Sequence, residues 1–339
     1  MSPRRETFAP LSYLVFLLIT LGVALLCICL GSVWVPPEQA LGALVGNPGI
    51  EGTARSIIMD LRVPRVLAVA LCGAGLSLCG AAMQGLLRNP LADGSTLGVS
   101  SGASLGAVLA LAFGFTLPGL PQLGVMGMAI VFAFLSLLLI LALAWRLDAS
   151  LSTNTIILIG VIYSMFISAL MSLVIAFSGP RLHSVTFWTM GSLAGAQWNQ
   201  VLAMAVALAL CSLVLLRRGQ ELNAFAVGED NARSVGVEVK RVKLEVLIAV
   251  SVLIGVCVSI GGTIGFVGLV TPHAARLIVG PNHRRLLPAT LFLGAIFLML
   301  ADLIARTLLS PTELPLGVVT SLIGALCFVT LFARTRRVK

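Results

Sequence analysis

The chain alternates long, uncharged, mostly apolar runs with short polar connections. Each run is about 20 residues long, the length that a helix needs to cross a hydrocarbon core of about 30 Å. The runs show no alternation of apolar and polar positions, so they predict helices and not the strands of a membrane barrel. The ten expected spans are Leu11–Leu30, Pro64–Leu86, Thr96–Phe115, Gly124–Trp145, Thr155–Phe177, Val201–Leu216, Leu244–Ile260, Phe266–Val279, Leu287–Leu309 and Gly317–Phe332. The sequence therefore predicts an all-α integral membrane protein, with residues 1–339 forming a single transmembrane domain.

The composition agrees with this prediction. Hydrophobic residues make up 58% of the chain, charged residues 10%, and the mean hydropathy is +1.07, which is too apolar for a globular protein in water. The first run is long and has no small-residue cleavage site before Pro36, so we expect it to be retained and not removed as a signal peptide. All seven cysteines fall inside expected spans without metal-ligand spacing, which predicts buried small side chains.

The basic residues predict the orientation of the spans, because cytoplasmic loops of membrane proteins collect lysine and arginine. With ten spans and both termini in the cytoplasm, 17 of the 22 bases and eight of the 13 acids lie inside, which places the whole formal charge of +9 on that side. The five bases expected outside are Arg55, Arg62, Arg65, Arg181 and Arg306. The pattern indicates a multi-pass protein of the bacterial inner membrane, and no basic stripe suggests nucleic-acid binding.

One polar segment interrupts the apolar pattern. Residues 221–243, "ELNAFAVGEDNARSVGVEVKRVK", hold four acids and four bases. Glu229 and Asp230 suit a helix N-terminus, where negative charge is favoured. Gly228 separates them from the preceding turn, and Gly236 is placed to end the helix. We therefore predict two short helices in an L shape, which we call the coupling segment for reasons given below.

Several kinds of chemistry are absent from the sequence. The chain has no G-x-x-x-x-G-K-[ST] phosphate loop and no H-E-x-x-H zinc motif, so we expect neither an ATP site nor an enzyme. The glycines of "CGAGLSLCG" (Cys72–Gly80) lie in an expected span and indicate close helix packing. The clear acid within a span is Asp302, and Arg306 one turn later can pair with it. If the protein is a transporter, its energy is expected to come from outside the chain.

Four stretches carry a resemblance to a known family. They are "LRVPRVLAVALCGAGLSLCGAAMQGLLRNPLADGSTLGVSSGASLGA" (Leu61–Ala107), "FWTMGSLAGAQW" (Phe187–Trp198), "VGEDNARSVGVEV" (Val227–Val239) and the stretch Gly262–Val329. In order and spacing they resemble the permease subunits of ABC importers for ferric siderophores, haem and cobalamin, the FecCD/BtuC-like family. The resemblance implies a homodimer of ten-helix permeases, two cytoplasmic ATPase subunits that carry ATP and Mg, and an external substrate-binding protein. It implies no cofactor in this chain.

The same resemblance implies roles for three groups of residues. Arg62, Arg65 and Arg306 match outward-facing arginines that meet acidic residues of the binding protein, and guanidinium groups suit carboxylate docking. The alternative is that they reach lipid headgroups.

A second group matches positions that narrow the inner mouth of the pathway. It consists of Asn89, Pro90, Leu91, Thr153 and Asn154. A fixed turn at Pro90 is expected in any case, because proline donates no backbone hydrogen bond and restricts the residue before it. A purely structural turn is the alternative.

The third group matches the segment that enters a cleft on the ATPase and transmits its movement. It consists of Gly228, Glu229, Asp230, Ala232, Arg233 and Gly236. A solvated loop is the alternative. The glycine-rich "GGTIGFVG" (Gly261–Gly268) favours a broken or tightly packed helix over direct cargo contact.

We therefore expect an ATP-driven importer permease for a metal chelate. A ferric siderophore is the first expectation, as the commonest cargo of the family, and haem and cobalamin are alternatives. A secondary carrier driven by an ion gradient, or a membrane scaffold without transport activity, would belong to other classes. The carrier would need an ionisable site in the middle of the membrane, and the sequence offers no convincing one.

Overall fold

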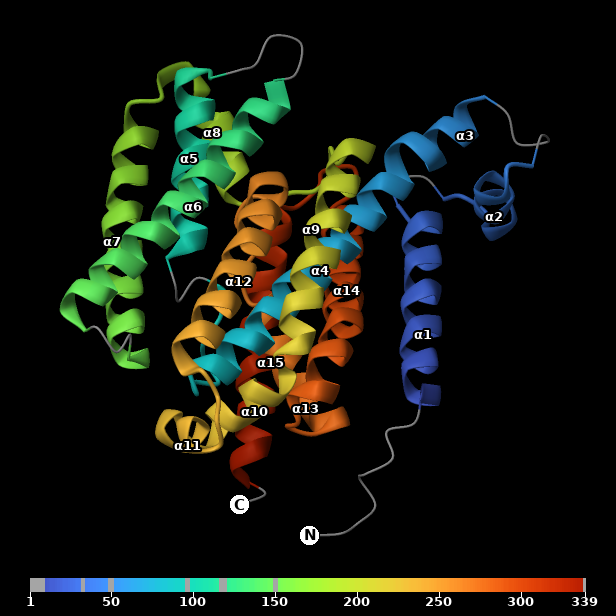
Figure 1. Cartoon of the computed structure of the whole chain (residues 1–339). Coiled ribbons are helices and arrows are strands. Elements are labelled where there is room, and N and C mark those ends of the chain that lie inside the picture. The colour runs from blue at the N-terminus through green and yellow to red at the C-terminus, as the bar shows by residue number, and fades with distance from the viewer. Residues whose placement is uncertain are drawn as a thin grey trace.

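The computed structural model describes residues 10–31, 34–47, 52–94, 98–115, 121–148 and 152–337. Within these ranges the chain forms helices and no strands (Figure 1). The long apolar helices are α1 (Pro10–Cys29), α4 (Val63–Leu86), α5 (Val99–Phe113), α6 (Pro121–Leu147), α7 (Thr153–Ala176), α9 (Trp198–Arg217), α12 (Val239–Gly261), α13 (Val267–Val279), α14 (His283–Thr307) and α15 (Leu316–Arg337). The shorter elements are α2 (Pro37–Val45), α3 (Thr53–Ser56), η2 (Ile57–Arg62), η4 (Gly179–Arg181), α8 (Leu182–Thr189), α10 (Gly219–Val227) and α11 (Glu229–Ser234).

Each expected span coincides with one long helix, with edges that differ by a few residues. The largest differences are at α12, α14 and α15. The first two begin five and four residues before the expected starts at Leu244 and Leu287, because polar first turns precede their apolar runs, and α15 ends five residues after Phe332. The expected start at Thr96 lies outside the described residues. Seven of these helices are long and apolar enough to cross a membrane, whereas α5, α13 and the apolar part of α15 are shorter. The count of ten crossings therefore stays a prediction.

The middle of the molecule is built on close crossings between glycines. A Cβ atom added to Gly73 of α4 would lie 2.3 Å from the carbonyl oxygen of Gly294 on α14. One added to Gly80 would lie 1.9 Å from the carbonyl oxygen of Gly268 on α13. No side chain fits at these points, so the helices approach backbone to backbone. This confirms the packing function predicted for the glycines of Cys72–Gly80.

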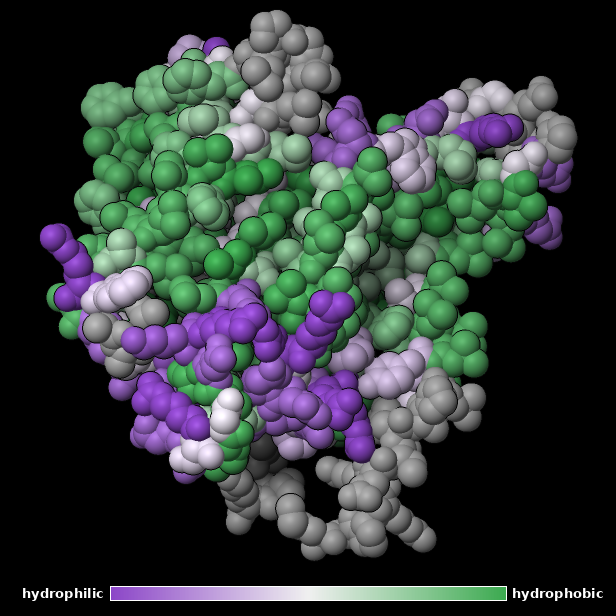
Figure 2. Space-filling model, viewed as in Figure 1, coloured by the Kyte–Doolittle hydropathy of each residue, from purple (hydrophilic) through white to green (hydrophobic). Residues whose placement is uncertain are grey.

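The long helices form a central group with two flanks. Figure 1 shows α4, α9, α12, α13, α14 and α15 in the centre, α5, α6 and α7 on one side, and α1 on the other. The start of α1 and the end of α15 lie at the same end of the bundle as α10 and α11. Figure 2 shows hydrophilic side chains gathered at that end, below an apolar band. We call it the cytoplasmic end, following the charge pattern, and the opposite end the outer end.

Three distant segments meet in one tight junction beside the break between α12 and α13. The Ser192 amide donates to the Gly261 carbonyl, and the amides of Leu316 and Gly317 donate to the carbonyls of Gly191 and Met190. Added Cβ atoms on Gly191, Gly262 and Gly317 would each lie 2.4 Å from a carbonyl oxygen of another segment. The glycines of two of the family-like stretches therefore serve packing here. The helix is broken, as the sequence allowed.

Most of the cysteines lie where the sequence predicts. Six of the seven are buried, and Cys327 on α15 is partly exposed. The outer arm formed by α2, α3 and η2 was not predicted, since its helices are short and carry no long apolar run.

Candidate functional site

A cavity of about 490 Å³ opens between α4, α5, α7, α12, α13 and α15. Its wall combines apolar side chains with hydroxyl groups and the carboxylate of Asp93, and none of the described residues that line it is basic. The broken segment between α12 and α13 contributes main chain from Gly262 to Phe266. The polar side chains are those of Asp93, Ser100, Ser101, Ser104, Thr263 and Ser321. Such a wall can hold a bulky ligand through hydroxyl hydrogen bonds and apolar contact, and offers no counter-charge to an anion.

The predicted turn after α4 is present. The Asn89 side-chain oxygen accepts from the Leu91 amide at 2.9 Å, and the Asn89 carbonyl accepts from the Ala92 amide at 3.1 Å. Pro90 sits between them, so the turn is fixed by an Asx hydrogen bond and a proline. Leu91 is 52% exposed and lines the cavity. The structure thus brings one predicted gate residue to the cavity, while the gating role itself stays a prediction.

The coupling segment folds as two short helices, as predicted. Gly228 separates α10 from α11 and has a φ of 134°, a conformation that side-chain-bearing residues rarely adopt. Gly236 has a φ of 86°, and the amides of Gly236 and Val237 donate to the carbonyls of Arg233 and Ala232. This is a Schellman-type end, which confirms that Gly236 stops the helix.

The Glu229 carboxylate joins three elements at the cytoplasmic end. Its Oε1 atom accepts from the Thr153 hydroxyl on α7 at 2.8 Å and lies 2.7 Å from the ammonium of Lys243 on α12. The Lys243 side chain is only 1% exposed, and that of Glu229 is 20% exposed. A predicted gate residue and a predicted coupling residue are therefore in direct contact. Asn154, the next residue of α7, is exposed beside them.

The rest of α11 faces outward at the cytoplasmic end. Asp230 pairs with Arg233 at 3.2 Å, and both side chains are exposed. Ala232 is buried and holds α11 to the bundle, whereas Val227 and Val235 on either side of α11 are 68% and 73% exposed. These exposed side chains leave the outward face of α11 free of contacts with the described part of the chain's bundle.

Sequence reasoning missed the residues that fasten α10. The Asn223 side-chain oxygen accepts from the backbone amide and the Nδ1–H of His283, and the Asn223 amide group donates to the side chain of Asn282, the N-cap of α14. Arg218 pairs with Glu221 and with Glu245 of α12. The sequence offered a signal in the Asn282 cap before an apolar run, but the partners about 60 residues away could not be read from it.

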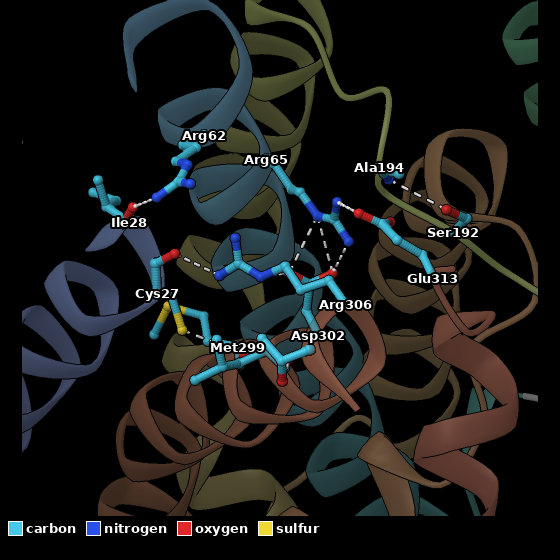
Figure 3. A network of polar contacts seen from close by, with 12 residues as sticks. Cys27, Ile28, Arg62, Arg65, Ser192, Ala194, Met299, Asp302, Arg306 and Glu313 are labelled. Carbon is cyan, nitrogen blue, oxygen red and sulfur yellow. Dashed lines mark hydrogen bonds and ion pairs between the residues drawn. The ribbon is translucent and has the colours of Figure 1, made fainter. Parts of the chain in front are cut away.

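The three arginines predicted to face the binding protein lie in one cluster at the outer end (Figure 3). Arg65 on α4 binds Asp302 of α14 through Nε and Nη2 and binds Glu313 at 2.9 Å. Arg306 pairs with Asp302 at 3.5 Å, as the sequence predicted, and donates to the Cys27 carbonyl. The outer arginine cluster comprises Arg62, Arg65, Asp302, Arg306 and Glu313.

Two of these arginines turn their side chains into the protein at the outer end. Arg62 and Arg306 are 7% and 5% exposed, and Arg62 donates to the carbonyls of Ile28 and Cys29. The last carbonyls of a helix lack partners within it and attract cations, so the end of α1 draws both guanidinium groups inward. The exposed carboxylate of the cluster is Glu313, at 43%. Docking of a binding protein to these arginines stays a prediction.

Together, a bundle of long apolar helices, a cavity between them and an exposed helical segment at the cytoplasmic end define a polytopic transport permease. Comparison with known families agrees: residues 17–334 match the FecCD transport family. The chain belongs to this family of ABC transporter permeases.

Relatives with assigned names point to the same class. An uncharacterized ABC transporter permease, YvrB of Bacillus subtilis, is 44% identical over 88% of this chain and 84% of its own length. The cobalamin import permease BtuC of Halobacterium salinarum is 40% identical over 86% of this chain and 77% of its own. The molybdate import permease MolB of Haemophilus influenzae is 38% identical over 88% of this chain and 87% of its own. All three are named permeases, two of them of import systems, and the ABC permease family implies an ATPase and a substrate-binding protein as partners.

A solved structure supports the fold. An inward-facing structure described as a metal-chelate type ABC transporter has a TM-score of 0.86 and 34% sequence identity, covering 96% of this chain and all of its own. Membership of the family and the apolar helices together identify a multi-pass inner-membrane protein.

Proposed function

We propose that this chain is the permease subunit of an ATP-driven importer for a metal chelate, with cobalamin as the first candidate cargo. The observation that carries the proposal is the 40% identity to a cobalamin import permease, together with 38% and 39% identity to vitamin B12 permeases of Vibrio and Klebsiella. The sequence alone favoured a ferric siderophore from its frequency in the family, and that cargo stays a prediction that the same experiment tests.

Molybdate is the second candidate, because the molybdate permease is 38% identical. The cavity wall argues against it. An oxyanion is held best by cations or by converging amide donors, whereas the described lining residues include no lysine or arginine and one carboxylate, Asp93. Hydroxyl groups and apolar surface suit a large chelate of low charge.

We propose that two copies of the chain form the pathway, each with ten membrane crossings. The support is that α7 and α15 reach the cavity through Met171 and Ser321 and also carry exposed apolar side chains such as Met165 and Leu326, 69% and 71% exposed. A second copy packed on this face would bury these side chains and close the open side of the cavity. ATP and Mg would be held by two separate ATPase subunits, since this sequence has no phosphate loop.

The coupling segment would receive the movement of the ATPases, and the residues around Asn89–Leu91 and Thr153–Asn154 would open the inner mouth. The exposed valines beside α11 and the Asp230–Arg233 pair support the first role. The contact between Glu229 and Thr153 supports a direct connection between the two. The outer end would meet the binding protein, with Glu313 and the arginines as the charged groups available there.

The cargo can be tested with the binding protein that works with this permease. We expect cyanocobalamin to raise the melting temperature of the purified binding protein. We also expect the visible spectrum of cyanocobalamin to change on binding. It should give no response to a ferric siderophore, haem or molybdate. A response to the ferric siderophore alone would replace cobalamin by siderophore, and a response to molybdate alone would overturn the chelate proposal.

The energy source is tested separately by reconstituting the permease in liposomes with and without its ATPase. Uptake is expected only with the ATPase and ATP. Concentrative uptake driven by an ion gradient without the ATPase would support a secondary carrier instead.

A further inference from the structure

The contacts of Glu229 are unequal in strength. One is an ion pair with Lys243, whose side chain is 1% exposed. The other is a hydrogen bond from the Thr153 hydroxyl. Removing the partner of a buried charge destabilises a protein more than removing one hydrogen bond to a charged group does. The ion pair is therefore the contact that persists when the segment moves, and the Thr153 hydrogen bond is the one that gives way first.

The two contacts also lie on different elements. Lys243 belongs to α12, which packs against α4, α5, α6, α9 and α11 and is largely buried. Thr153 is the first residue of α7, which packs chiefly against α5 and α6 at the flank of the bundle. Glu229 is thus held to α12 by the ion pair with Lys243 and is joined to α7 by the weaker hydrogen bond from Thr153.

Space for such a movement exists beside the contact. A groove of about 730 Å³ runs between the start of α7 and α11. Its wall includes Arg88 next to the Asn89 turn, Ser152 and Asn154 around Thr153, and Gly228 before α11. The first turn of α7 therefore borders open space on the side that faces α11.

We infer that Glu229 is a positioning residue that holds the start of α7 to the coupling segment through Thr153, with Lys243 as its fixed anchor. The inference rests on the proposed role of the coupling segment. Movement imposed on α11 is carried by the α11–α12 pair and reaches α7 through one hydroxyl group. The gate region of α7 therefore follows the ATPase while the hydrogen bond holds and is freed when it breaks.

The test uses the complete complex of permease, ATPase and binding protein in liposomes. Thr153→Val removes the hydroxyl at nearly constant volume, and Thr153→Ser keeps it. We expect Thr153→Val to lower cyanocobalamin uptake per ATP hydrolysed by about 10-fold, the equivalent of 1.4 kcal/mol, and Thr153→Ser to restore it. Thr20→Val is the matched control, because the Thr20 hydroxyl bonds to Phe16 within α1. It should leave the ratio unchanged.

A second readout does not depend on the cargo. Spin labels at Asn154 and Asn231, both exposed, report the distance between α7 and α11 in the nucleotide-free complex. We expect a narrow distance distribution with Thr153 or with Thr153→Ser and a broad one with Thr153→Val.

The outcomes separate this inference from the proposed function. If the unmodified complex takes up no cyanocobalamin, the proposed cargo fails, while the distance measurement still decides on the link. If Thr153→Val leaves the distance distribution narrow, or if Thr153→Ser broadens it equally, the inference is wrong even where ATP-driven uptake is normal.

Discussion

The outer arginine cluster and the contacts of Glu229 are both built around buried cations, but they hold different kinds of element. In the outer cluster Arg65 and Arg306 share Asp302, and Arg62 and Arg306 bind the last carbonyls of α1. The helices it joins, α4 and α14, also cross at the glycine pair Gly73 and Gly294. Around Glu229, one ion pair and one hydroxyl join α11 and α12 to α7 at the flank.

The difference shows how one chain can be rigid at one end and movable at the other. The outer cluster joins guanidinium groups to carboxylates and carbonyls, and two of the helices that it holds, α4 and α14, also cross closely at their glycines. The Glu229 contacts end on α7 in a single neutral donor, with a groove beside it. We expect the outer cluster to determine stability and the Glu229 contacts to determine coupling.

The largest expected effect on stability is at Asp302 of the outer arginine cluster. Asp302→Ala leaves Arg65 and Arg306 buried without their shared carboxylate, which should lower the unfolding free energy by about 3–5 kcal/mol. Denaturant unfolding of the permease in detergent measures this. Asp60→Ala, which removes an exposed carboxylate on η2, is the control and should change little. Equal losses in the two variants would contradict a fastening role for the cluster.

The helix crossings that support the rigid part are tested at Gly80. A methyl group at this position would meet the Gly268 carbonyl oxygen, and overpacking of this kind costs about 1–3 kcal/mol. Gly80→Ala should therefore unfold at lower temperature than the unmodified protein. Gly127→Ala on α6, where nothing lies within 4 Å, should not. An unchanged melting temperature for Gly80→Ala would show that α4 and α13 can separate freely.

A smaller effect is expected at the exposed edge of the outer cluster. Glu313 is 43% exposed and shares Arg65 with Asp302. Glu313→Gln should lower the unfolding free energy by less than about 1 kcal/mol, because solvent screens an exposed ion pair. The same unfolding measurement, repeated at high salt, should show the difference shrinking further. A loss as large as that of Asp302→Ala would mean that Glu313 is part of the buried core of the cluster.

The smallest stability effect is expected on the coupling segment. Asp230 and Arg233 form an exposed pair on α11, and such helix pairs contribute about 0.3–0.5 kcal/mol. Asp230→Asn should leave the melting temperature within error, whereas the charge reversal Arg233→Glu should reduce ATP hydrolysis stimulated by the binding protein. If Arg233→Glu changed only the stability, α11 would not be a contact for the ATPase.

The sequence predicted what depends on local patterns. A run of about 20 apolar residues predicts a membrane helix by itself, and Gly228 and Gly236 bound α11 where a short polar helix needs them. It could not predict which charges meet. Arg65 and Asp302 are 237 residues apart, and Thr153 and Glu229 are 76 apart. Lys243 counted among the cytoplasmic bases because charge statistics do not show that its side chain turns into the bundle.

The outer arginines also show that a single sequence does not reveal which distant groups meet. Their position at the outer end was predicted from the charge pattern, whereas the burial of Arg62 and Arg306 depends on partners from distant segments. Carbonyls at the end of α1 and two carboxylates from distant segments provide acceptors for three guanidinium groups, of which those of Arg62 and Arg306 are buried. A single sequence contains all of these groups but gives no direct sign of their proximity.

The junction of Gly191, Gly262 and Gly317 has a consequence for how such permeases diversify. Gly262 lines the cavity, and a side chain at any of the three glycines would meet a carbonyl oxygen of another segment. Changes of cargo preference must therefore come from other lining positions, such as Ser100, Ser104 and Ser321. We therefore expect that exchanging those few residues between relatives, while the three glycines are kept, changes which cargo the permease accepts.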